Sequence, residues 1–215
     1  MIDGDRVELT VVGKISDIGE FDWDACASSS DAGSRPVDPF VTYRFLKGLE
    51  DSKSIGAGTG WMPQYIVAKY NEKLIGVMPS FAKGHSQGEY IFDHNWAHAY
   101  ENSGGKYYPK LQVSIPFTPV TGRRFLTLPE FHDIAQSALL EGLQIIVRQQ
   151  RWSSAHITFC SAEEFKAGEE LGLLQRIGQQ FHWENQSYKN FDEFLINLSS
   201  RKRKNIKKER RIAAN

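Results

Sequence analysis

The sequence predicts an α+β (mixed α/β) fold, with a mostly antiparallel central sheet flanked by helices and a basic helix at the C-terminal end. Three observations favour it: a hairpin of two apolar strands, a long amphipathic helix, and short strands and helices that alternate after it. The 215 residues are 40% hydrophobic and 12% aromatic, which suits one ordinary core and excludes disorder of the whole chain. No apolar run approaches the roughly 20 residues that cross a bilayer, and the first residues do not resemble a secretory signal, so a cytoplasmic location is expected.

Local patterns predict the elements in the first half of the chain. β-Branched residues indicate a strand over 7–14. The turn YNEK, placed between two apolar runs at 64–69 and 74–81, indicates the hairpin. Asp38 followed by Pro39 is typical of a helix start. Further strands are expected at 89–92 and 111–115.

The second half alternates helices and strands. Apolar residues at spacings of three and four predict a long helix over 129–151. A buried strand is expected at 155–159, a helix from Ser161 to Leu171, and a strand-like segment at 174–183. We expect a body at 1–190 and a separate basic helix at 191–215.

Charge is distributed unevenly along a chain of zero net charge. Residues 201–215 hold eight Lys or Arg and one Glu, so they carry +7, and the other 200 residues carry −7 (18 basic, 25 acidic). Such a helix is expected to meet a polyanion, for example tRNA or an anionic membrane, through Arg201, Lys204, Lys208 and Arg211 on one side. The alternatives are a solvated terminal helix or docking on an acidic domain. The run contains no aromatic residue, which argues against recognition of bases.

Residues 83–108 are rich in titratable and aromatic side chains. They contain three histidines, three acids, one Trp and four tyrosines around glycines, which suits a binding cleft. Candidate general bases are His85, Glu89 and His94. Candidate substrate-binding residues are Lys83, Ser86, Gln87, Tyr90, Asp93, Trp96, Tyr107, Tyr108 and Lys110. The alternative is an aromatic-rich loop whose polar tips only bond the backbone.

Two other possible sites follow from short motifs. The loop 116–124 has hydroxyls, a glycine and arginines ahead of a helix, so a phosphate could be held by Thr118, Thr121, Gly122 and Arg123. The alternative is a proline-braced turn with surface ion pairs. His94 and His98 are four apart, yet no spaced metal signature accompanies them, and the two cysteines form no paired motif, so no metal site is expected.

Several strings together resemble the FemAB-like proteins of Proteobacteria, within the GNAT acyltransferase superfamily. They are FDWDACA, DPFVTYRFLKGLEDS, GWMPQYIVA, KGHSQGEYIFDHNWAHAYE, GGKYYPKLQVSIPFTPVTGRRFL and LSSRKRKNIKKERR. The resemblance implies a GNAT-like fold and an acyl- or aminoacyltransferase of bacterial peptidoglycan metabolism. It also implies acyl-CoA or aminoacyl-tRNA as co-substrate, with no permanently bound cofactor, and a cell-wall precursor or other amine as acceptor.

The resemblance also bears on the organisation of the protein. Relatives contain two tandem GNAT-like halves, and the chain matches the first half with the basic helix that leads toward the second. Because the second half contributes to the cleft in Fem-type enzymes, the resemblance leaves open whether this part is active alone or is a non-catalytic binding module. In GNAT enzymes the loop before the long helix binds the donor pyrophosphate, and it corresponds here to residues 118–123, without the usual Arg/Gln-x-x-Gly-x-Gly/Ala pattern.

Overall fold

A computed structural model describes residues 6–28 and 38–214 of the chain. The chain divides into two compact units, Met1–Gln175 and Arg176–Asn215, and each is described by itself. The boundary that the sequence suggests, at residue 190, falls inside the second unit.

The described part of the first unit contains two four-stranded sheets, in the orders β1-β3-β4-β7 and β2-β5-β6-β8. Neighbouring strands are antiparallel except β6 and β8, which are parallel. The strands are β1 (Val7–Val12), β2 (Trp61–Pro63), β3 (Tyr65–Tyr70), β4 (Lys73–Met78), β5 (Ser80–Lys83), β6 (Lys110–Val113), β7 (Leu126–Thr127) and β8 (Ala155–Ile157). Together with the flanking helices they confirm the predicted α+β class.

One long hairpin joins the two sheets. Strands β3 and β4 form the predicted hairpin, with Ile66 opposite Met78. The same two chain segments then pair again as β2 and β5, with Met62 opposite Ala82. The amide of Gln64 donates to the carbonyl of Ser80 at 2.8 Å and bridges the gap between them. The end of β5 is therefore paired with β2 on one side, and β6 pairs with it on the other.

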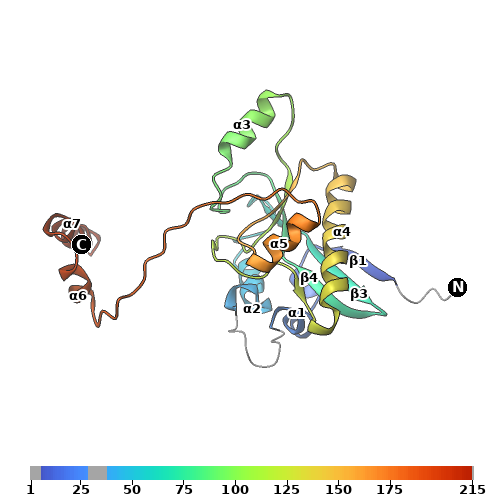
Figure 1. Ribbon diagram of the computed structural model, residues 1–215, viewed down its shortest axis with the longest axis horizontal. Helices are drawn as coiled ribbons and strands as arrows, with labels where there is room; N and C mark the ends of the chain where they lie inside the picture. Colours follow the sequence, from blue (N-terminus) through green and yellow to red (C-terminus); the bar gives the residue numbers. More distant parts are fainter. Residues whose placement is uncertain (1–5, 29–37, 215) are drawn as a thin grey trace. The chain divides into compact units, whose positions relative to one another are not determined.

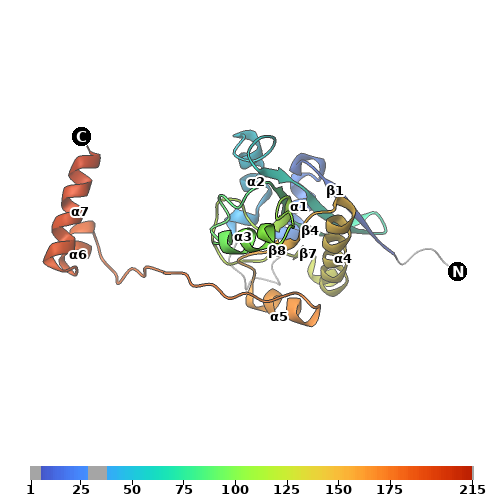
Figure 2. The ribbon, with the colours of Figure 1, turned by 90° about the horizontal axis from the view of Figure 1, so that it is seen from above.

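Helices cover both faces of the first sheet (Figure 1). The predicted long helix is α4 (His132–Gln150), preceded by a 3-10 turn at Pro129–Phe131. Alternation along β3 explains the two cores: Val67 faces the helix α1 side, whereas Ile66 faces α4. Figure 2 shows α2 and α5 on opposite sides of this unit. The other helices are α1 (Glu20–Ala27), α2 (Tyr43–Asp51), α3 (His94–Asn102) and α5 (Ala162–Glu170).

Two expected strands are wrong. The segment 89–92 turns instead of extending, because Gly88 and Tyr90 have positive φ angles of 78° and 57°. The segment 174–183 has no regular structure, since no neighbouring strand in the described residues supplies a hydrogen-bonded ladder. Its apolar side chains are exposed, with Leu174 at 97% and Phe181 at 91%.

In the second unit the expected single helix is broken in two, α6 (Phe191–Ile196) and α7 (Ser200–Ala213). Two side chains explain the break. Ser199 caps the start of α7 by accepting from the amide of Lys202 at 3.5 Å. The Arg203 guanidinium turns back and donates to the last carbonyls of α6, those of Leu195 and Ile196, at 2.9 Å each.

Candidate functional site

Two buried lysines lie opposite each other in the second sheet. Lys83 is the last residue of β5, Lys110 is the first of β6, and the register pairs them directly. Both side chains are completely buried. Like charges at facing positions of an antiparallel pair repel each other, so this arrangement requires negative charge close by.

Glu89 and Asp93 supply that charge. The Lys110 Nζ donates to Glu89 Oε2 at 2.8 Å and to Asp93 Oδ2 at 2.6 Å. The Lys83 Nζ lies 4.0 Å from Glu89 Oε1. The carboxylates are 3% and 0% exposed, so two positive and two negative groups share one dry site and balance formally.

A tight turn brings the two carboxylates to the lysines. Gly88 takes a positive φ, and a Cβ there would lie 2.6 Å from the ring of Phe117, so only glycine fits. The Gly88 carbonyl also accepts from the amide of Phe117 at 3.2 Å. Asp93 then begins α3, because its carbonyl accepts from the amides of Trp96 and Ala97 at 3.0 Å each.

Hydroxyl groups complete the lysine–carboxylate cluster. Ser86 Oγ donates to Asp93 Oδ2 at 2.9 Å and accepts from Lys110 Nζ at 2.9 Å. Its remaining contact, with Tyr108 Oη at 2.7 Å, is therefore one in which Tyr108 donates. Tyr107 Oη donates to Asp93 Oδ2 at 2.8 Å. The members of the cluster are Lys83, Ser86, Glu89, Asp93, Tyr107, Tyr108 and Lys110.

Burial and pairing shift the titration of these groups. Burial lowers the pKa of Lys83 to about 7, which the Glu89 charge opposes and the Lys110 charge reinforces. Burial raises the pKa of Glu89 although Lys110 donates to it. Burial also acts to raise the pKa of Asp93, but hydrogen bonds from Lys110, Ser86 and Tyr107 outweigh it and leave that pKa below its usual value.

One aromatic ring, that of Trp61, packs against the Lys83 end of the cluster. The Nζ of Lys83 lies 3.4 Å from the centroid of the Trp61 ring and donates to the Gln87 carbonyl at 3.2 Å. The indole N–H of Trp61 donates to the same carbonyl at 3.0 Å. A cation over an indole face is favourable, and more so where water is excluded. The sequence patterns missed this role of Trp61, because no motif places it near Lys83.

Both carboxylates keep a further acceptor. Glu89 Oε1 and Asp93 Oδ1 are buried and accept no hydrogen bond from the described residues. Buried polar atoms are normally paired, so such atoms deserve a functional explanation. The cluster can therefore take up a proton at either carboxylate without first breaking a hydrogen bond.

The structure brings together most, but not all, of the candidate residues in 83–108. The cluster holds Glu89 and six of the nine candidate substrate-binding residues. Gln87 contributes its carbonyl, while Tyr90 and Trp96 are exposed, at 55% and 59%. His94 is exposed at the start of α3, a helix that projects from the body in Figure 1. His85 is half-buried, and its Nδ1 accepts from the Gln87 amide at 3.2 Å.

The groups of the loop expected to hold a phosphate mostly make hydrogen bonds to backbone carbonyls of the protein itself. Thr118 donates from Oγ1 to the Pro116 carbonyl at 3.0 Å, and the amide of Gly122 donates to the Phe159 carbonyl at 3.0 Å. The Arg123 guanidinium donates to the carbonyl of Ala27. Thr121 is exposed. Of the four candidates, Thr121 is thus the one whose side chain the described contacts leave open to a ligand.

A buried carboxylate and a buried arginine, Glu164 and Arg124, anchor the same loop. The Glu164 Oε1 accepts from the amides of Arg124 and Phe125 at 2.7 and 2.8 Å. The buried Arg124 side chain donates from Nε to the Thr158 carbonyl at 3.0 Å. These contacts tie the loop to Thr158, which follows β8, and to α5. The sequence patterns indicate Arg123 as a phosphate ligand and do not single out Arg124, whose side chain holds the loop in place.

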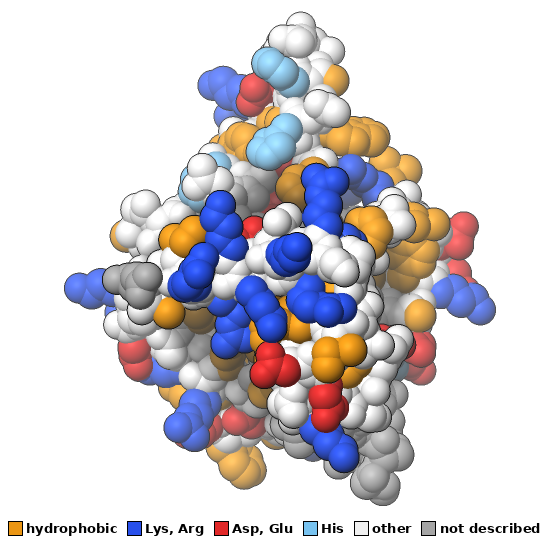
Figure 3. Space-filling model, turned by 90° about the vertical axis from the view of Figure 1, so that its left-hand side faces the viewer, with side chains coloured by type: hydrophobic (Ala, Val, Ile, Leu, Met, Phe, Trp, Pro, Cys, Tyr) orange, Lys and Arg blue, Asp and Glu red, His pale blue; other side chains and the backbone are white. Residues whose placement is uncertain are grey.

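The basic helix α7 leaves all but one of its cations exposed. Arg201, Lys204, Lys208 and Arg211 are all exposed. Arg203, in contrast, folds back onto α6, and Arg210 lies over the Phe191 ring, with Cζ 4.1 Å from its centroid. Figure 3 shows several Lys and Arg side chains gathered near the middle of the face that it draws.

Within residues 6–28 and 38–214, no group of three or more His, Cys, Asp or Glu is arranged to hold a metal ion. In the same part of the chain, no helix is long and apolar enough to span a membrane.

Comparison with known proteins gave one family. The model of the FemAB-like family, described as peptidoglycan biosynthesis/recognition, matches residues 14–215. This confirms the resemblance found in the sequence strings. No curated protein matched the chain.

Solved structures similar to the chain include several acetyltransferases. Ribosomal-protein-alanine N-acetyltransferase from Brucella melitensis biovar Abortus 2308 is 14% identical, with a TM-score of 0.48, covering 84% of this chain and 100% of that one. Aminoglycoside N-acetyltransferase AAC(6')-Iy in complex with CoA is 12% identical, with a TM-score of 0.48, covering 86% and 98%. A possible acetyltransferase from Clostridium difficile 630 is 10% identical, with a TM-score of 0.49, covering 83% and 97%.

Proposed function

The chain belongs to the FemAB-like family, and from this membership we propose that it transfers an acyl or aminoacyl group from an activated donor to an amine acceptor. The family description supports a cell-wall precursor as the acceptor. The observation that carries the proposal is a continuous hydrogen-bonded path from the half-buried Tyr108 to the buried Glu89.

The path accounts for the proton that amine attack releases. The acceptor nitrogen forms a bond to the donor carbonyl carbon, and the carbon–sulfur or carbon–oxygen bond to the leaving group breaks. Lys110 gives a proton to Glu89 and rotates so that its freed lone pair faces Ser86, and the Ser86 hydroxyl turns its proton from Asp93 to Lys110. The amine proton then passes to Tyr108, the Tyr108 proton to Ser86, and the Ser86 proton to Lys110. Each transfer crosses one hydrogen bond, of 2.7, 2.9 and 2.8 Å.

Glu89 is the most suitable terminal base of this path. Its pKa is raised by burial, so it holds a proton more readily than an exposed carboxylate does. Asp93 instead stays ionised and holds Lys110, Ser86 and Tyr107 in position. His85 and His94 remain alternative bases, since a bound acceptor amine could contact either ring directly.

The test is acyl transfer followed by mass spectrometry, with acetyl-CoA or alanyl-tRNA as donor and a soluble peptidoglycan precursor as acceptor. We expect Glu89→Gln and Tyr108→Phe each to lower kcat about 100-fold or more, the usual contribution of general-base catalysis. Tyr43→Phe, on α2, is the matched control and keeps wild-type turnover. Unchanged turnover in both cluster variants refutes the path, and loss of activity only in His85→Gln or His94→Gln moves the base to that histidine.

The donor is identified in the same assay. Product from acetyl-CoA but not from alanyl-tRNA establishes a thioester donor, and the reverse establishes an aminoacyl ester. Thr121→Ala raises the KM for the donor if the loop at residues 118–123 holds its phosphate. An unchanged KM removes that loop from the donor site.

We also propose that α7 binds a polyanion. The supporting observation is that Arg201, Lys204, Lys208 and Arg211, at helical spacings of three and four, are all exposed. Binding of tRNA or of anionic vesicles is expected to fall steeply with salt, because bound cations release counterions. The double variant Lys204→Gln/Lys208→Gln reduces the slope of log K against log salt by about 1 to 2. Absence of binding at low salt makes α7 a solvated helix.

A further inference from the structure

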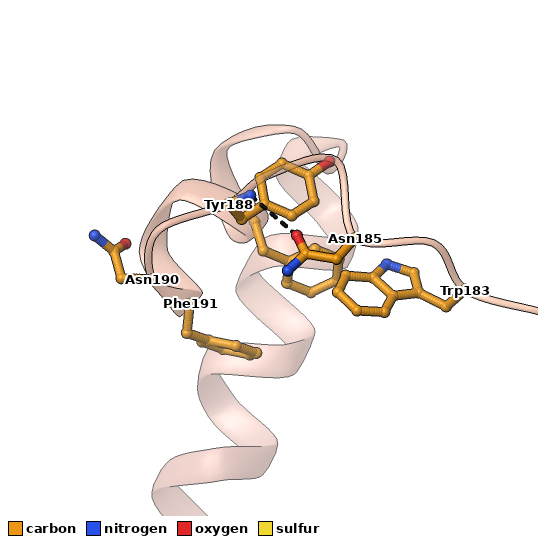
Figure 4. A pocket seen from close by; sticks show the side chains of 6 residues that line it. Trp183, Asn185, Tyr188, Asn190 and Phe191 are labelled. Atoms are coloured by element: carbon orange, nitrogen blue, oxygen red, sulfur yellow. Dashed lines mark hydrogen bonds between the residues drawn. The ribbon is translucent and has the colours of Figure 1, made fainter. Parts of the chain in front are cut away.

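The second unit contains a hollow built from aromatic rings. Its volume is about 400 Å³, and it is lined by Trp183, Asn185, Tyr188, Asn190, Phe191 and Phe194 (Figure 4). Three rings surround Phe194, with centroids 5.7 Å (Trp183), 5.7 Å (Tyr188) and 5.5 Å (Phe191) from it. Although the rings contact one another, Trp183 is 65% exposed and Phe191 is 40% exposed. Large flat apolar surfaces therefore remain open in this aromatic hollow.

One polar group points among the rings. Asn185 Oδ1 accepts from the amide of Tyr188 at 3.0 Å, which leaves the Asn185 Nδ2 to donate. Figure 4 shows this nitrogen between the rings, whereas Asn190 turns its amide away from them. The hollow thus offers ring faces and a hydrogen-bond donor, which together suit a flat ring that bears a carbonyl or ring-nitrogen acceptor.

Positive charge lies directly beside the hollow. Arg210 covers the Phe191 ring, with Cζ 4.1 Å from the centroid, and it belongs to α7. The exposed cations of α7 extend from this point along a helix of 14 residues. A ligand whose ring enters the hollow therefore has its attached groups in a positive environment, which favours an anion next to the ring.

From these contacts we propose that the aromatic hollow binds a nucleobase whose attached phosphate is held by the cations of α7. The base comes from a free nucleotide or from an unpaired nucleotide of a single strand, and both share this chemistry. The basic run itself contains no aromatic residue. The rings that supply stacking come from 183–194, a stretch outside that run. The inference is independent of acyl transfer and adds base recognition to the polyanion proposal for α7.

The test compares binding of two probes to the full-length chain by fluorescence anisotropy. The first is a labelled hexauridylate, and the second is an abasic oligomer of equal charge. We expect the base-bearing probe to bind about 5- to 150-fold more tightly, the range that one stacked base contributes. Trp183→Ala abolishes this preference and leaves abasic binding unchanged, whereas Trp183→Phe keeps most of it.

The matched control is Phe181→Ala, which removes an exposed ring two positions from Trp183 that does not line the hollow. It leaves the preference intact. Equal affinity for the two probes, or an unchanged preference in Trp183→Ala, overturns the base-binding inference even if both probes bind through α7. Competition by free uridine monophosphate identifies a nucleotide as the source, and its failure against a tight oligomer identifies a single strand.

Discussion

Replacement of Lys110 by Met tests whether the lysine–carboxylate cluster is a balanced buried ion network. Met has nearly the length of Lys and no charge, so the variant removes the three hydrogen bonds of Nζ and leaves Glu89 and Asp93 buried. The remaining amine, that of Lys83, is 4.0 Å from Glu89 and makes no close contact to compensate. Leaving a buried charge without its partner costs about 3–5 kcal/mol.

This loss is expected to depend on pH in a defined direction. In the wild type the pKa of Asp93 lies below its unfolded value, so its stabilisation is present above that unfolded pKa and is lost as pH falls through the folded one. Without Lys110, burial raises the pKa values of both carboxyls above their unfolded values. Folding then takes up protons, and the variant gains stability relative to wild type as pH falls.

Urea titrations at pH 8 and pH 5 measure both effects. We expect Lys110→Met to lose about 4 kcal/mol at pH 8 and at least about 1 kcal/mol less at pH 5, since one unit of pKa corresponds to about 1.4 kcal/mol. Lys47→Met is the control, because Lys47 pairs with Asp51 at the exposed surface of α2, where an ion pair contributes little to stability. A loss below about 1 kcal/mol at pH 8, or a loss that grows toward pH 5, refutes the network.

Three further substitutions test other parts of the structure. The folded pKa of Lys83, about 7, lies below its unfolded value of 10.5, so this group makes the protein more stable as pH rises from 7 to 10. Lys83→Met removes that contribution. In urea titrations at pH 7 and pH 9, the free energy of unfolding therefore increases less in the variant than in wild type, and an equal increase contradicts the assignment. Glu164→Ala leaves the buried amides of Arg124 and Phe125 without an acceptor, so it lowers the free energy of unfolding by about 2–4 kcal/mol. Calorimetry measures this loss, and a change below about 1 kcal/mol contradicts the prediction. Gly60→Ala puts a Cβ 2.1 Å from the His85 ring, whereas Gly104→Ala adds only the strain of a φ of 83° with nothing within 4 Å. The Gly60 variant is therefore expected to lose more stability and to shift the NMR resonances of the His85 ring. Equal losses of stability in the two variants contradict the contact.

The elements that the sequence predicts correctly are those whose signal is local. The hairpin has a turn between two apolar runs, and α4 has an apolar stripe over five turns, so both are found within a few residues. The break between α6 and α7 was not predicted, because it depends on Arg203 folding back to cap a helix eight residues earlier. The segment 174–183 has the composition of a strand, but composition does not supply a neighbour to pair with.

In the candidate site too, the sequence predicts what is local and misses what depends on contacts between distant segments. Clustering of polar and aromatic residues in 83–108 was sufficient to find Glu89, Asp93 and Ser86, since all are near one another in sequence. Which of them meet could not be predicted, because the pairing of Lys83 with Lys110 is a property of strand register. Trp61, which lies 26 residues before its hydrogen-bond partner Gln87, was missed for the same reason.

The position of the histidines changes how proton transfer in this protein is understood. Histidine is the obvious candidate base in a sequence, because its ordinary pKa is near neutrality. Here His94 and His98 are exposed on α3 and His85 lies outside the hydrogen bonds of the cluster, while burial brings a lysine to a pKa of about 7. Within the cluster, near-neutral titration is therefore produced mainly by the burial of Lys83, which Glu89 opposes and the facing Lys110 reinforces. Since this effect requires the whole cluster, its residues act as one unit, and the loss caused by any one of them is not additive with the others.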